Sequence, residues 1–554
     1  MNIVDIFEQR AKSHPDAPAI IDSHRGKSRV TTYAELELAS QKIAALLQRQ
    51  GLQAGDTVLV FYPMSAELYI VLGAIFRLGV IAMFIDPSAG REHIERCCRL
   101  HQPHALIASP NAHLLRLVSS ELRRIPKKFV LGGYAFGATK IDWEDHWERP
   151  HWERPHPAGK TVASKLTALK SDPCVSLARR MRAFPVKTLP ALITFTSGST
   201  GQPKAALRTH EFLLAQHQVL HHSLDLKEGE IDLTTLPVFV LANLASGVTS
   251  LIPKADLRFP GAIDPAPIVE QIQKYELQST AASPAFLEKI ADYCLNKKII
   301  LTTLQKIFTG GAPVFPRLLE KLQRIAPQAK IVAVYGSTEA EPIAEIAHSQ
   351  MTERDTFLMQ RGSGLLAGVP VPEIELRILC DQSGSAISPL TLDEFEKSCL
   401  ENNVAGEIVV SGAHVLSGYL HGHGNEETKF SVAGKIWHRT GDAGYLDEAG
   451  RLWLLGRCAA KIVDERGILY PFAVECVALS YPNIKRAALM QQQGKRLLVI
   501  ERINRREELN KQELRNILAW AQLDEIRIIG QIPVDKRHNA KVDYPALKQL
   551  IGNG

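Results

Sequence analysis

Hydrophobic and polar positions over residues 1–130 alternate between patterns typical of helices and patterns typical of strands. Residues 33–47 have the mixed apolar and polar pattern of a helix, residues 57–61 form the short apolar run of a strand, and residues 66–78 again predict a helix. Helices and strands that alternate in this way are typical of an α/β fold with largely parallel sheets. We therefore predict an α/β protein from this part of the chain.

The C-terminal part, residues 457–554, has a pattern of its own. Residues 472–480 predict a helix, residues 486–490 and 496–500 predict strands, and residues 507–519 predict a second helix. This order indicates a small α+β unit after the larger α/β part.

Residues 133–188 interrupt this alternation of helix and strand patterns. It contains a tandem repeat in which residues 146–150 and 151–155 both read His-Trp-Glu-Arg-Pro, followed by His156. Three histidines at this spacing could suggest a metal site, but the proline that ends each repeat prevents a helix that would place them on one face, and no cysteine lies nearby. We interpret residues 133–188 as a variable surface insertion and assign it no chemistry.

Composition narrows the classes of protein. With 554 residues the chain is long enough for more than one domain, and 45% hydrophobic and 22% charged residues are ordinary for a soluble protein. A net charge of +6 without a long basic run gives no reason to expect nucleic acid as a partner. The most hydrophobic stretch, residues 68–84, contains Arg77 and predicts a buried helix followed by a strand, not a transmembrane segment.

The N-terminal sequence and the cysteines indicate the cellular compartment in which the protein is expected. The N-terminus lacks a basic segment followed by an apolar core, so no signal peptide is expected. The eight cysteines show no C-x-x-C spacing, and the adjacent Cys97 and Cys98 are poorly placed for an ordinary disulfide. We expect a reduced, cytoplasmic compartment.

The most informative motif is a loop of hydroxyl and glycine residues that follows the apolar run 189–193. Its two glycines let the backbone turn N–H groups inward, and hydroxyl groups and one ammonium surround the same space, which suits phosphate oxygens. It is not the common P-loop, because Lys204 follows Gly201 by three residues and no Ser or Thr comes next. A flexible linker is the other interpretation, which the preceding strand and Pro203 disfavour. The candidate phosphate-binding residues are Thr196, Ser197, Gly198, Ser199, Thr200, Gly201 and Lys204.

Four further motifs follow in order. Two of them come directly after strand-like runs: Gly310-Gly-Ala-Pro313 after residues 304–308, and Tyr335-Gly-Ser-Thr-Glu339 after residues 331–334. The third combines Thr440-Gly-Asp442 with Gly456-Arg457, and the fourth is the segment 533–541, which ends at Lys541. Together with the loop, these motifs resemble, in type and order, those of the adenylate-forming superfamily of acyl-CoA synthetases, luciferases and peptide-synthetase adenylation domains.

The resemblance implies the fold of an adenylate-forming enzyme. A large N-terminal domain of stacked α/β sheets, residues 1–456, would bind ATP and the acyl substrate. A small mobile α+β domain, residues 457–554, would carry a catalytic lysine. The junction would lie at Gly456-Arg457.

The resemblance also implies a role for each motif in attack of a carboxylate on the α-phosphorus of ATP. The hydroxyl-rich loop would bind the β- and γ-phosphates, and Glu339 would hold Mg²⁺, which prefers carboxylate and phosphate oxygens. Lys541 would stabilise charge in the transition state, a role for which Lys536, Arg537 and His538 are competing candidates. A surface glutamate and solvated surface charges are the other interpretations of Glu339, Asp442 and Arg457. The remaining implied contacts are Gly310, Gly311 and Ala312 on the adenine side, Tyr335 stacked on adenine beside Gly336, Thr338 at the α-phosphate, Asp442 on the ribose, and Arg457 on the ribose or phosphate.

The expected substrate is a hydrophobic carboxylic acid. Residues 235–241 lie where amino-acid-activating relatives carry an aspartate, and they contain no acid. The apolar residues 238–241 suggest a pocket for an acyl chain, or they are core strand residues. No carrier-protein serine is present, since residues 131–135 end in Ala135.

Departures from the family pattern concern the second half-reaction. Many acyl-CoA synthetases have an acidic residue directly after the Gly-Arg pair, whereas here Cys458-Ala-Ala-Lys461 follows and the first acid is Asp464. The sequence Arg537-His-Asn-Ala-Lys541, together with residues 230–237, is more similar to the β-lactone synthetases of bacterial olefin biosynthesis. In these enzymes a 3-hydroxyl of the substrate would attack the adenylate.

Three hypotheses remain open at this point. One is an ATP- and Mg-dependent ligase of a fatty or 2-alkyl-3-hydroxy acid that ends on CoA or by β-lactone closure. Another is an acyl-AMP ligase that loads a separate carrier protein or serves a pathway partner enzyme. The third is a non-catalytic nucleotide-binding relative, which the filled lysine, glutamate and aspartate positions disfavour.

Overall fold

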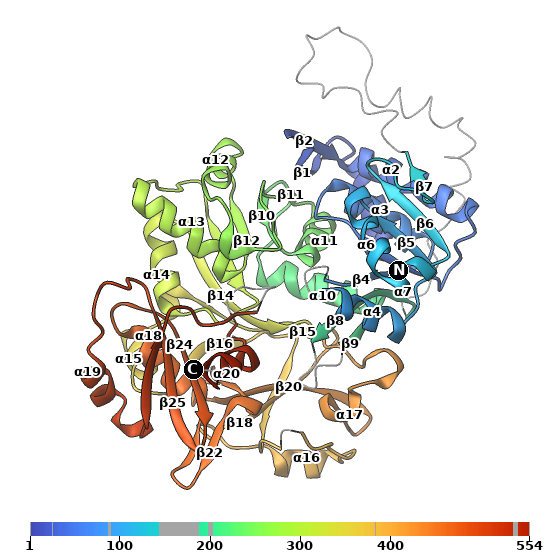
Figure 1. The fold of residues 1–554 in the computed structure, drawn as a ribbon. Helices are drawn as coiled ribbons and strands as arrows, with labels where there is room; N and C mark the ends of the chain where they lie inside the picture. Colours follow the sequence, from blue (N-terminus) through green and yellow to red (C-terminus); the bar gives the residue numbers. More distant parts are fainter. Residues whose placement is uncertain are drawn as a thin grey trace. The chain divides into compact units, whose positions relative to one another are not determined.

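The computed structural model describes residues 2–24, 26–86, 90–142, 188–197, 203–382, 384–535 and 541–552. It divides into two compact units, coloured along the sequence in Figure 1. Unit 1 consists of Met1–Lys254 with Gly418–His423, and unit 2 of Ala255–Ser417 with Gly424–Gly554. The tandem repeat, residues 198–202 of the phosphate loop and residues 536–540 lie outside the described residues. The predicted boundary at residue 456 falls inside unit 2 and stays a prediction.

Unit 1 contains a seven-stranded sheet with the order β7-β6-β5-β3-β4-β8-β9. Its strands are parallel except for the pair β8–β9, as the alternation of helices and strands predicted. The strands are β3 (Thr57–Phe61), β4 (Ile81–Phe84), β5 (Ala105–Ala108), β6 (Lys127–Leu131), β7 (Thr139–Ile141), β8 (Pro190–Ser197) and β9 (Pro203–Thr209).

A second group of strands in unit 1 joins distant parts of the sequence. β1 (Pro18–His24) pairs with β11 (Thr249–Leu251) in parallel and with β2 (Lys27–Thr32) in antiparallel, and β10 (Ile231–Thr234) pairs with β11 in parallel. The helices of this unit are α1 (Ile3–Ser13), α2 (Tyr33–Arg49), α3 (Ala66–Arg77), α4 (Arg91–Leu100), α5 (Pro110–His113), α6 (Leu115–Val118), α7 (Ser120–Arg124), α10 (His210–Ser223) and α11 (Pro237–Ser246).

The predicted helices and strand of the first part are confirmed, and the structure shows why they form. Thr32 and Glu35 make a capping box that begins α2. Every residue of α3 is buried, and its Arg77 is neutralised inside the unit by Glu37, 2.5 Å away. Among the described residues, no helix has both the length and the apolar character needed to cross a membrane.

Residues 238–241 are not strand residues. They lie in α11, which begins at Pro237 and ends before Gly247, whose φ of +77° allows the left-handed turn that closes the helix. Phe239, Val240 and Leu241 are buried, so the alternative of a core strand is wrong, and a core helix takes its place.

Unit 2 contributes ten described strands to a mixed sheet. Nine of them follow the order β17-β18-β20-β21-β16-β15-β14-β13-β12, and β19 pairs with β20. The strands β12, β13 and β14 are parallel, and the pairs from β14 to β17 are antiparallel. The strands are β12 (Ser279–Ala282), β13 (Lys306–Gly310), β14 (Lys330–Ser337), β15 (Ala340–Ala347), β16 (Leu365–Pro370), β17 (Glu375–Leu379), β18 (Gly406–Ser411), β19 (Lys429–Val432), β20 (Lys435–Leu446) and β21 (Leu452–Arg457).

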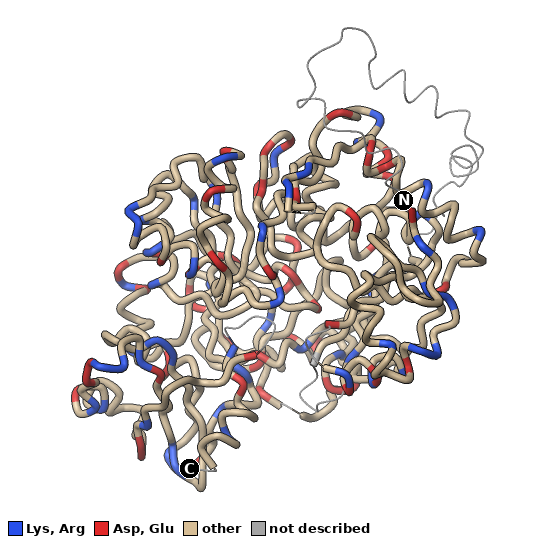
Figure 2. Tube along the Cα trace, turned by 45° about the horizontal axis from the view of Figure 1, so that its top comes forward, with Lys and Arg blue, Asp and Glu red and all other residues tan. Residues whose placement is uncertain are grey.

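The C-terminal segment adds a hairpin, β22 (Ile462–Asp464) with β23 (Gly467–Leu469), and a three-stranded sheet, β24 (Ile484–Gln492), β25 (Lys495–Arg502) and β26 (Glu525–Ile529). Lys, Arg, Asp and Glu are interspersed over the chain trace (Figure 2). The helices of unit 2 are α12 (Ala266–Lys274), α13 (Pro284–Lys297), α14 (Pro316–Ile325), α15 (Glu353–Met359), α16 (Leu392–Ser398), α17 (Asn425–Thr428), α18 (Pro471–Ser480), α19 (Lys511–Ile517) and α20 (Tyr544–Gly552).

The predicted elements of this segment are confirmed, with one difference in length. The helix expected over residues 507–519 is α19, which is shorter at both ends. It begins after Asn510 because the side chain of that residue accepts a hydrogen bond from the backbone N–H of Glu513 at 3.1 Å. A 3-10 turn at Ala519–Ala521 follows its other end.

One glycine of the mixed sheet gives a test of how tightly the strands approach. Gly368 has φ of +95°, and an added Cβ would lie 2.1 Å from the carbonyl oxygen of Glu345. We expect Gly368→Ala to lower the free energy of unfolding by about 3 kcal/mol or more, because backbone strain and a backbone clash add. Thermal unfolding measures this loss.

The matched control is Gly450→Ala. Gly450 also has positive φ, +71°, but an added Cβ would meet nothing within 4 Å. Gly450→Ala should therefore lower the free energy of unfolding by only about 1–2 kcal/mol, because it adds backbone strain without a clash. Equal losses in the two variants would contradict the close approach at Gly368.

Candidate active site

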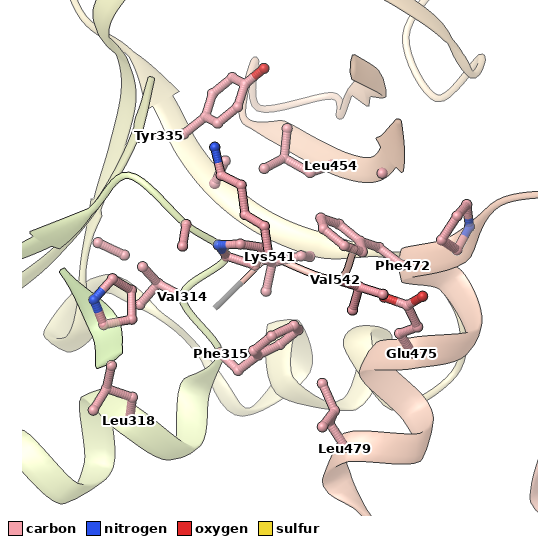
Figure 3. Close-up of a pocket in the computed structure, with 18 of the residues that line it drawn as sticks. Val314, Phe315, Leu318, Tyr335, Leu454, Phe472, Glu475, Leu479, Lys541 and Val542 are labelled. Atoms are coloured by element: carbon pink, nitrogen blue, oxygen red, sulfur yellow. The ribbon is translucent and has the colours of Figure 1, made fainter. Parts of the chain in front are cut away.

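A cavity of about 390 Å³ in unit 2 brings together seven of the candidate site residues. Its walls come from the loop after β13, the end of β14, β16, the paired strands β20 and β21, helix α18, and the segment that begins at Lys541 (Figure 3). The candidate residues that line it are Gly311, Ala312, Tyr335, Gly336, Asp442, Arg457 and Lys541.

The carboxylate of Asp442 is the centre of a polar cluster in this cavity. The hydroxyl of Tyr335 donates a hydrogen bond to its Oδ2 at 2.8 Å, and the Nε of Arg457 lies 3.2 Å from its Oδ1. Strand pairing explains the arrangement, because the register of β20 and β21 sets Asp442 opposite Arg457. Arg457 also donates to the carbonyl oxygen of Thr440 at 3.0 Å, which fixes the guanidinium against β20.

Burial and charge keep Tyr335 and Arg457 protonated at neutral pH. Burial raises the pKa of Tyr335 well above its ordinary value, and Asp442 raises it further, so the phenol stays protonated and donates. The negative charge of Asp442 raises the pKa of Arg457, with smaller contributions that include Glu339. The carboxylate can accept further hydroxyl groups at its remaining lone pairs, as binding of a ribose requires.

Lys541 also lines this cavity, and its chain segment is held by hydrogen bonds to Asp535. The backbone N–H of Lys541 donates to Oδ1 of Asp535 at 3.0 Å, and the backbone N–H of Asp535 donates to the carbonyl oxygen of Lys541 at 2.9 Å. The next residue outward on each side, Val534 and Val542, form an isolated β-bridge. Figure 3 shows the amino group of Lys541 pointing toward Tyr335.

The glycines of the adenine-side motif meet a packing requirement. Gly310 ends β13, and a Cβ there would lie 2.6 Å from the carbonyl oxygen of Val334 on the neighbouring strand. Gly311 follows with φ of +80°, a conformation that favours glycine. The two residues let the chain turn directly over the end of β14, and Gly311 and Ala312 line the cavity.

Tyr335 and Gly336 lie within β14 itself, whereas Thr338 and Glu339 make the tight turn between β14 and β15. Glu339 is half-buried in this hairpin and does not begin a helix, and its carbonyl oxygen accepts from the N–H of Leu416 at 2.7 Å. Neither Thr338 nor Glu339 is among the described residues that line the cavity.

Glu339 fits a magnesium ion that also binds phosphate. The described residues contain no group of three or more His, Cys, Asp or Glu side chains that could hold a metal by themselves. Magnesium characteristically takes one or two carboxylates together with phosphate oxygens and water, so a single glutamate near a nucleotide is a suitable donor set.

The phosphate-loop residues belong to unit 1. Thr196 and Ser197 end β8, and Thr196 is paired with Lys204 at the start of β9. The side chain of Lys204 is buried and its ammonium lies 5.8 Å from the ring centre of Tyr419. Gly198, Ser199, Thr200 and Gly201 lie outside the described residues, so their phosphate role stays a prediction.

The sequence motifs did not reveal the lower wall of the cavity. It is formed by Phe315 and Leu318 on one side and by Phe472 and Leu479 of α18 on the other (Figure 3), and the two phenyl rings meet edge to face with centres 6.4 Å apart. These residues looked like core positions in the sequence, and only their convergence in space shows that they line a cavity.

Glu475 is a second residue that the motifs did not reveal. It is a buried carboxyl on α18 whose Oε1 accepts from the backbone N–H of Leu489 at 2.9 Å and from the hydroxyl of Tyr544 at 2.7 Å. Desolvation raises its pKa to about 7. The signal in the sequence was one acid within an otherwise apolar helix. Its contacts join α18 and β24 to the chain just after Lys541.

Comparison with known proteins now adds to this geometry. A family model described as AMP-binding enzyme matches residues 7–420. The chain belongs to the AMP-binding enzyme family. It is 28% identical over 569 residues to an olefin beta-lactone synthetase of Stenotrophomonas maltophilia (strain K279a), and the alignment covers 98% of this chain and 96% of that protein. It is 25% identical over 480 residues to 4-coumarate--CoA ligase 2 of Nicotiana tabacum, covering 85% and 79% respectively.

Solved structures show the same fold. The amide bond synthetase McbA from Marinactinospora thermotolerans matches with a TM-score of 0.74 and 19% identity over 99% of both chains. The O-succinylbenzoate Coenzyme A synthetase MenE from Bacillus subtilis, in complex with ATP and magnesium ion, matches with a TM-score of 0.70 and 20% identity, again over 99% of both. The predicted superfamily and α/β fold are confirmed, and the protein is an ATP-dependent acid ligase that forms acyl adenylates.

The position of Lys541 predicts its effect on catalysis. We expect Lys541→Ala to lower the rate of adenylate formation by about a thousandfold, because a charge aimed at the transition state is lost, while the affinity for ATP changes little. Acid-dependent ATP–pyrophosphate exchange and nucleotide titration measure the two quantities. Lys485→Ala is the matched control, since Lys485 lines the same cavity but pairs with Glu501 at 2.7 Å. Normal exchange by Lys541→Ala would disprove the assignment.

The buried carboxyl Glu475 predicts a pH-dependent stability. Its pKa of about 7 in the folded protein exceeds the ordinary value, so its contribution to stability is complete at low pH and is lost as pH rises toward and through 7. Glu475→Gln keeps the acceptor oxygen without the charge. The difference in free energy of unfolding between this variant and wild type should shift by about 3 kcal/mol in favour of the variant from pH 4.5 to pH 8.5. Denaturant unfolding at the two pH values measures it.

The control for this effect is Glu501→Gln. Lys485 and Arg486 lower the pKa of Glu501, so the loss of this carboxylate should destabilise the protein at both pH values. A Glu475→Gln variant whose stability relative to wild type does not change with pH would show that Glu475 is not a buried acid of raised pKa.

Proposed function

We propose that this enzyme activates a hydrophobic carboxylic acid and closes the acyl adenylate to a β-lactone. The observation that carries the activation step is the convergence of Tyr335, Asp442, Arg457 and Lys541 on one cavity. In this step a carboxylate oxygen of the substrate bonds to the α-phosphorus of ATP. The bond from that phosphorus to the bridging oxygen breaks, and pyrophosphate leaves with the electron pair.

The described residues supply binding and charge for this step. Asp442, oriented by Tyr335 and Arg457, would hold the ribose hydroxyls, and the glycine turn at residues 310–312 would hold the adenine side. Lys541 would neutralise the carboxylate and the α-phosphate as they meet, which is the main electrostatic obstacle between two anions. Magnesium, when bound through Glu339, would supply further neutralisation of phosphate charge.

The same chain segments support closure without a thiol. Lys461, which follows the Gly-Arg pair by four residues, forms a 2.6 Å ion pair with the buried Asp381. Asp464, the first acid after that pair, is engaged by Arg496 at 2.6 Å and by Arg466 at 2.9 Å. Of these contacts, the Lys461–Asp381 pair joins the two sides of the predicted junction, so a large rotation at the predicted hinge would have to break it.

Intramolecular closure requires no second substrate to enter. The 3-hydroxyl oxygen would bond to the acyl carbon, the bond from that carbon to the phosphate oxygen would break, AMP would leave, and the hydroxyl proton would pass to solvent or to a base. The similarity to olefin beta-lactone synthetases over 98% of the chain supports this acceptor. Transfer to CoA, which the similarity to 4-coumarate–CoA ligases favours, and loading of a carrier protein are the alternatives.

The proposal extends to the cellular compartment of the enzyme. The seven cysteines within the described residues are all free thiols, including the adjacent Cys97 and Cys98. Free thiols persist in a reducing compartment, so we place the enzyme in the cytoplasm, where ATP is available.

Product analysis tests the proposal. The purified enzyme is given Mg-ATP with a plain long-chain fatty acid or with a 2-alkyl-3-hydroxy acid, each with and without CoA, and products are identified by mass spectrometry. We expect a dehydrated lactone and AMP from the hydroxy acid without CoA. A thioester that forms only when CoA is present would instead make the enzyme an acyl-CoA synthetase and would exclude the lactone proposal.

A further inference from the structure

An unusual cluster of exposed apolar side chains lies on unit 1, away from the residues discussed so far. In α5–α6 and the residue between them, Leu114 is 61% exposed, Leu117 is 73% exposed and Val118 is 52% exposed. In the loop after β6, Tyr134 is 76% exposed and Phe136 is 85% exposed. Single exposed apolar residues are ordinary, but five large ones on two short segments are not.

The two segments are neighbours in space. Arg116 of α6 donates a hydrogen bond from its Nη1 to the carbonyl oxygen of Phe136 at 2.9 Å. At Gly133 an added Cβ would lie 2.7 Å from the ring of Pro110, so the loop rests on the start of α5. The two segments that carry the five exposed side chains are therefore adjacent, and we name these five residues the apolar edge.

Basic side chains accompany the apolar edge. Residues 110–128 contain five Lys or Arg and a single acid, Glu121. Arg123 donates to the carbonyl oxygen of Leu117 at 3.0 Å, and Arg116 to that of Phe136, which keeps both guanidinium groups at the edge itself. Within the ranges that the structure describes, neither arginine forms an ion pair with a carboxylate, whereas Arg124 pairs with Glu121 at 3.0 Å.

We propose that the apolar edge docks on an anionic lipid bilayer. Leucine, valine and aromatic side chains that project from short segments insert into the boundary between headgroups and acyl chains, and arginines beside them pair with lipid phosphate. The complementary charge is the reason to prefer a bilayer over a second copy of this chain, whose edge would present the same positive charge. Docking would place the enzyme where a hydrophobic acid is most concentrated.

The experiment is co-sedimentation of the full-length protein with sucrose-loaded vesicles. One vesicle preparation is pure phosphatidylcholine and the other contains 30% phosphatidylglycerol. We expect binding to the anionic vesicles that weakens as salt is added, because the guanidinium–phosphate attraction is screened. The double variant Leu117→Glu with Phe136→Glu should bind at least about tenfold more weakly, since both apolar tips become anionic.

The matched control is Phe357→Glu. Phe357 is 53% exposed in unit 2 and has the guanidinium of Arg361 at 5.2 Å from its ring centre, so it is an exposed phenylalanine beside an arginine outside the apolar edge. This control should bind vesicles as wild type does. Circular dichroism and thermal unfolding would show that each variant is folded.

Three outcomes would overturn the proposal. The first is no sedimentation with either kind of vesicle. The second is equal binding by wild type and by the double variant of the apolar edge. The third is a concentration-dependent dimer in light scattering that the double variant abolishes while vesicles are not bound, since the edge would then be an interface between two copies.

Discussion

The position of one carboxylate, that of Asp442, determines the geometry of the proposed nucleotide site. Three strands of unit 2 bring their side chains to it: β20 carries Asp442, β21 carries Arg457 opposite, and β14 carries Tyr335. Because strand register moves side chains in steps of one residue and reverses the face at each step, this cluster forms only in one register of the sheet. Strand pairing therefore fixes the positions of these three side chains, where we propose that the nucleoside binds.

Lys541, the proposed catalytic lysine, is held by hydrogen bonds of its own chain segment and not by strand register. The backbone N–H of Lys541 donates to the carboxylate of Asp535, and the backbone N–H of Asp535 donates to the carbonyl oxygen of Lys541. Tyr544 ties the same stretch to Glu475 on α18. A buried acid without a cationic partner is expensive, and its raised pKa expresses that cost. The hydrogen bonds of Glu475 lie where α18, β24 and the segment after Lys541 meet. They therefore help to order the chain segment that carries the ammonium group of Lys541.

The sequence was most informative where a motif requires a specific residue type. Asp442, Arg457, Tyr335 and Lys541 were predicted from their motifs, and the structure brings all four to one cavity. The apolar lining of that cavity was not predictable, because Phe472 and Leu479 have the same pattern as core residues of any helix. Residues 238–241 show the same limit: a short apolar run fits a strand or a buried helix equally, and only Pro237 hinted at the helix start.

The central claim is that this site joins a carboxylate to the α-phosphate of ATP. Acid-dependent exchange of labelled pyrophosphate into ATP measures that step directly, because only reversal of adenylate formation returns pyrophosphate to ATP. We predict exchange that requires Mg-ATP and a hydrophobic acid and needs no CoA. Release of ADP and phosphate with no pyrophosphate exchange would contradict the account.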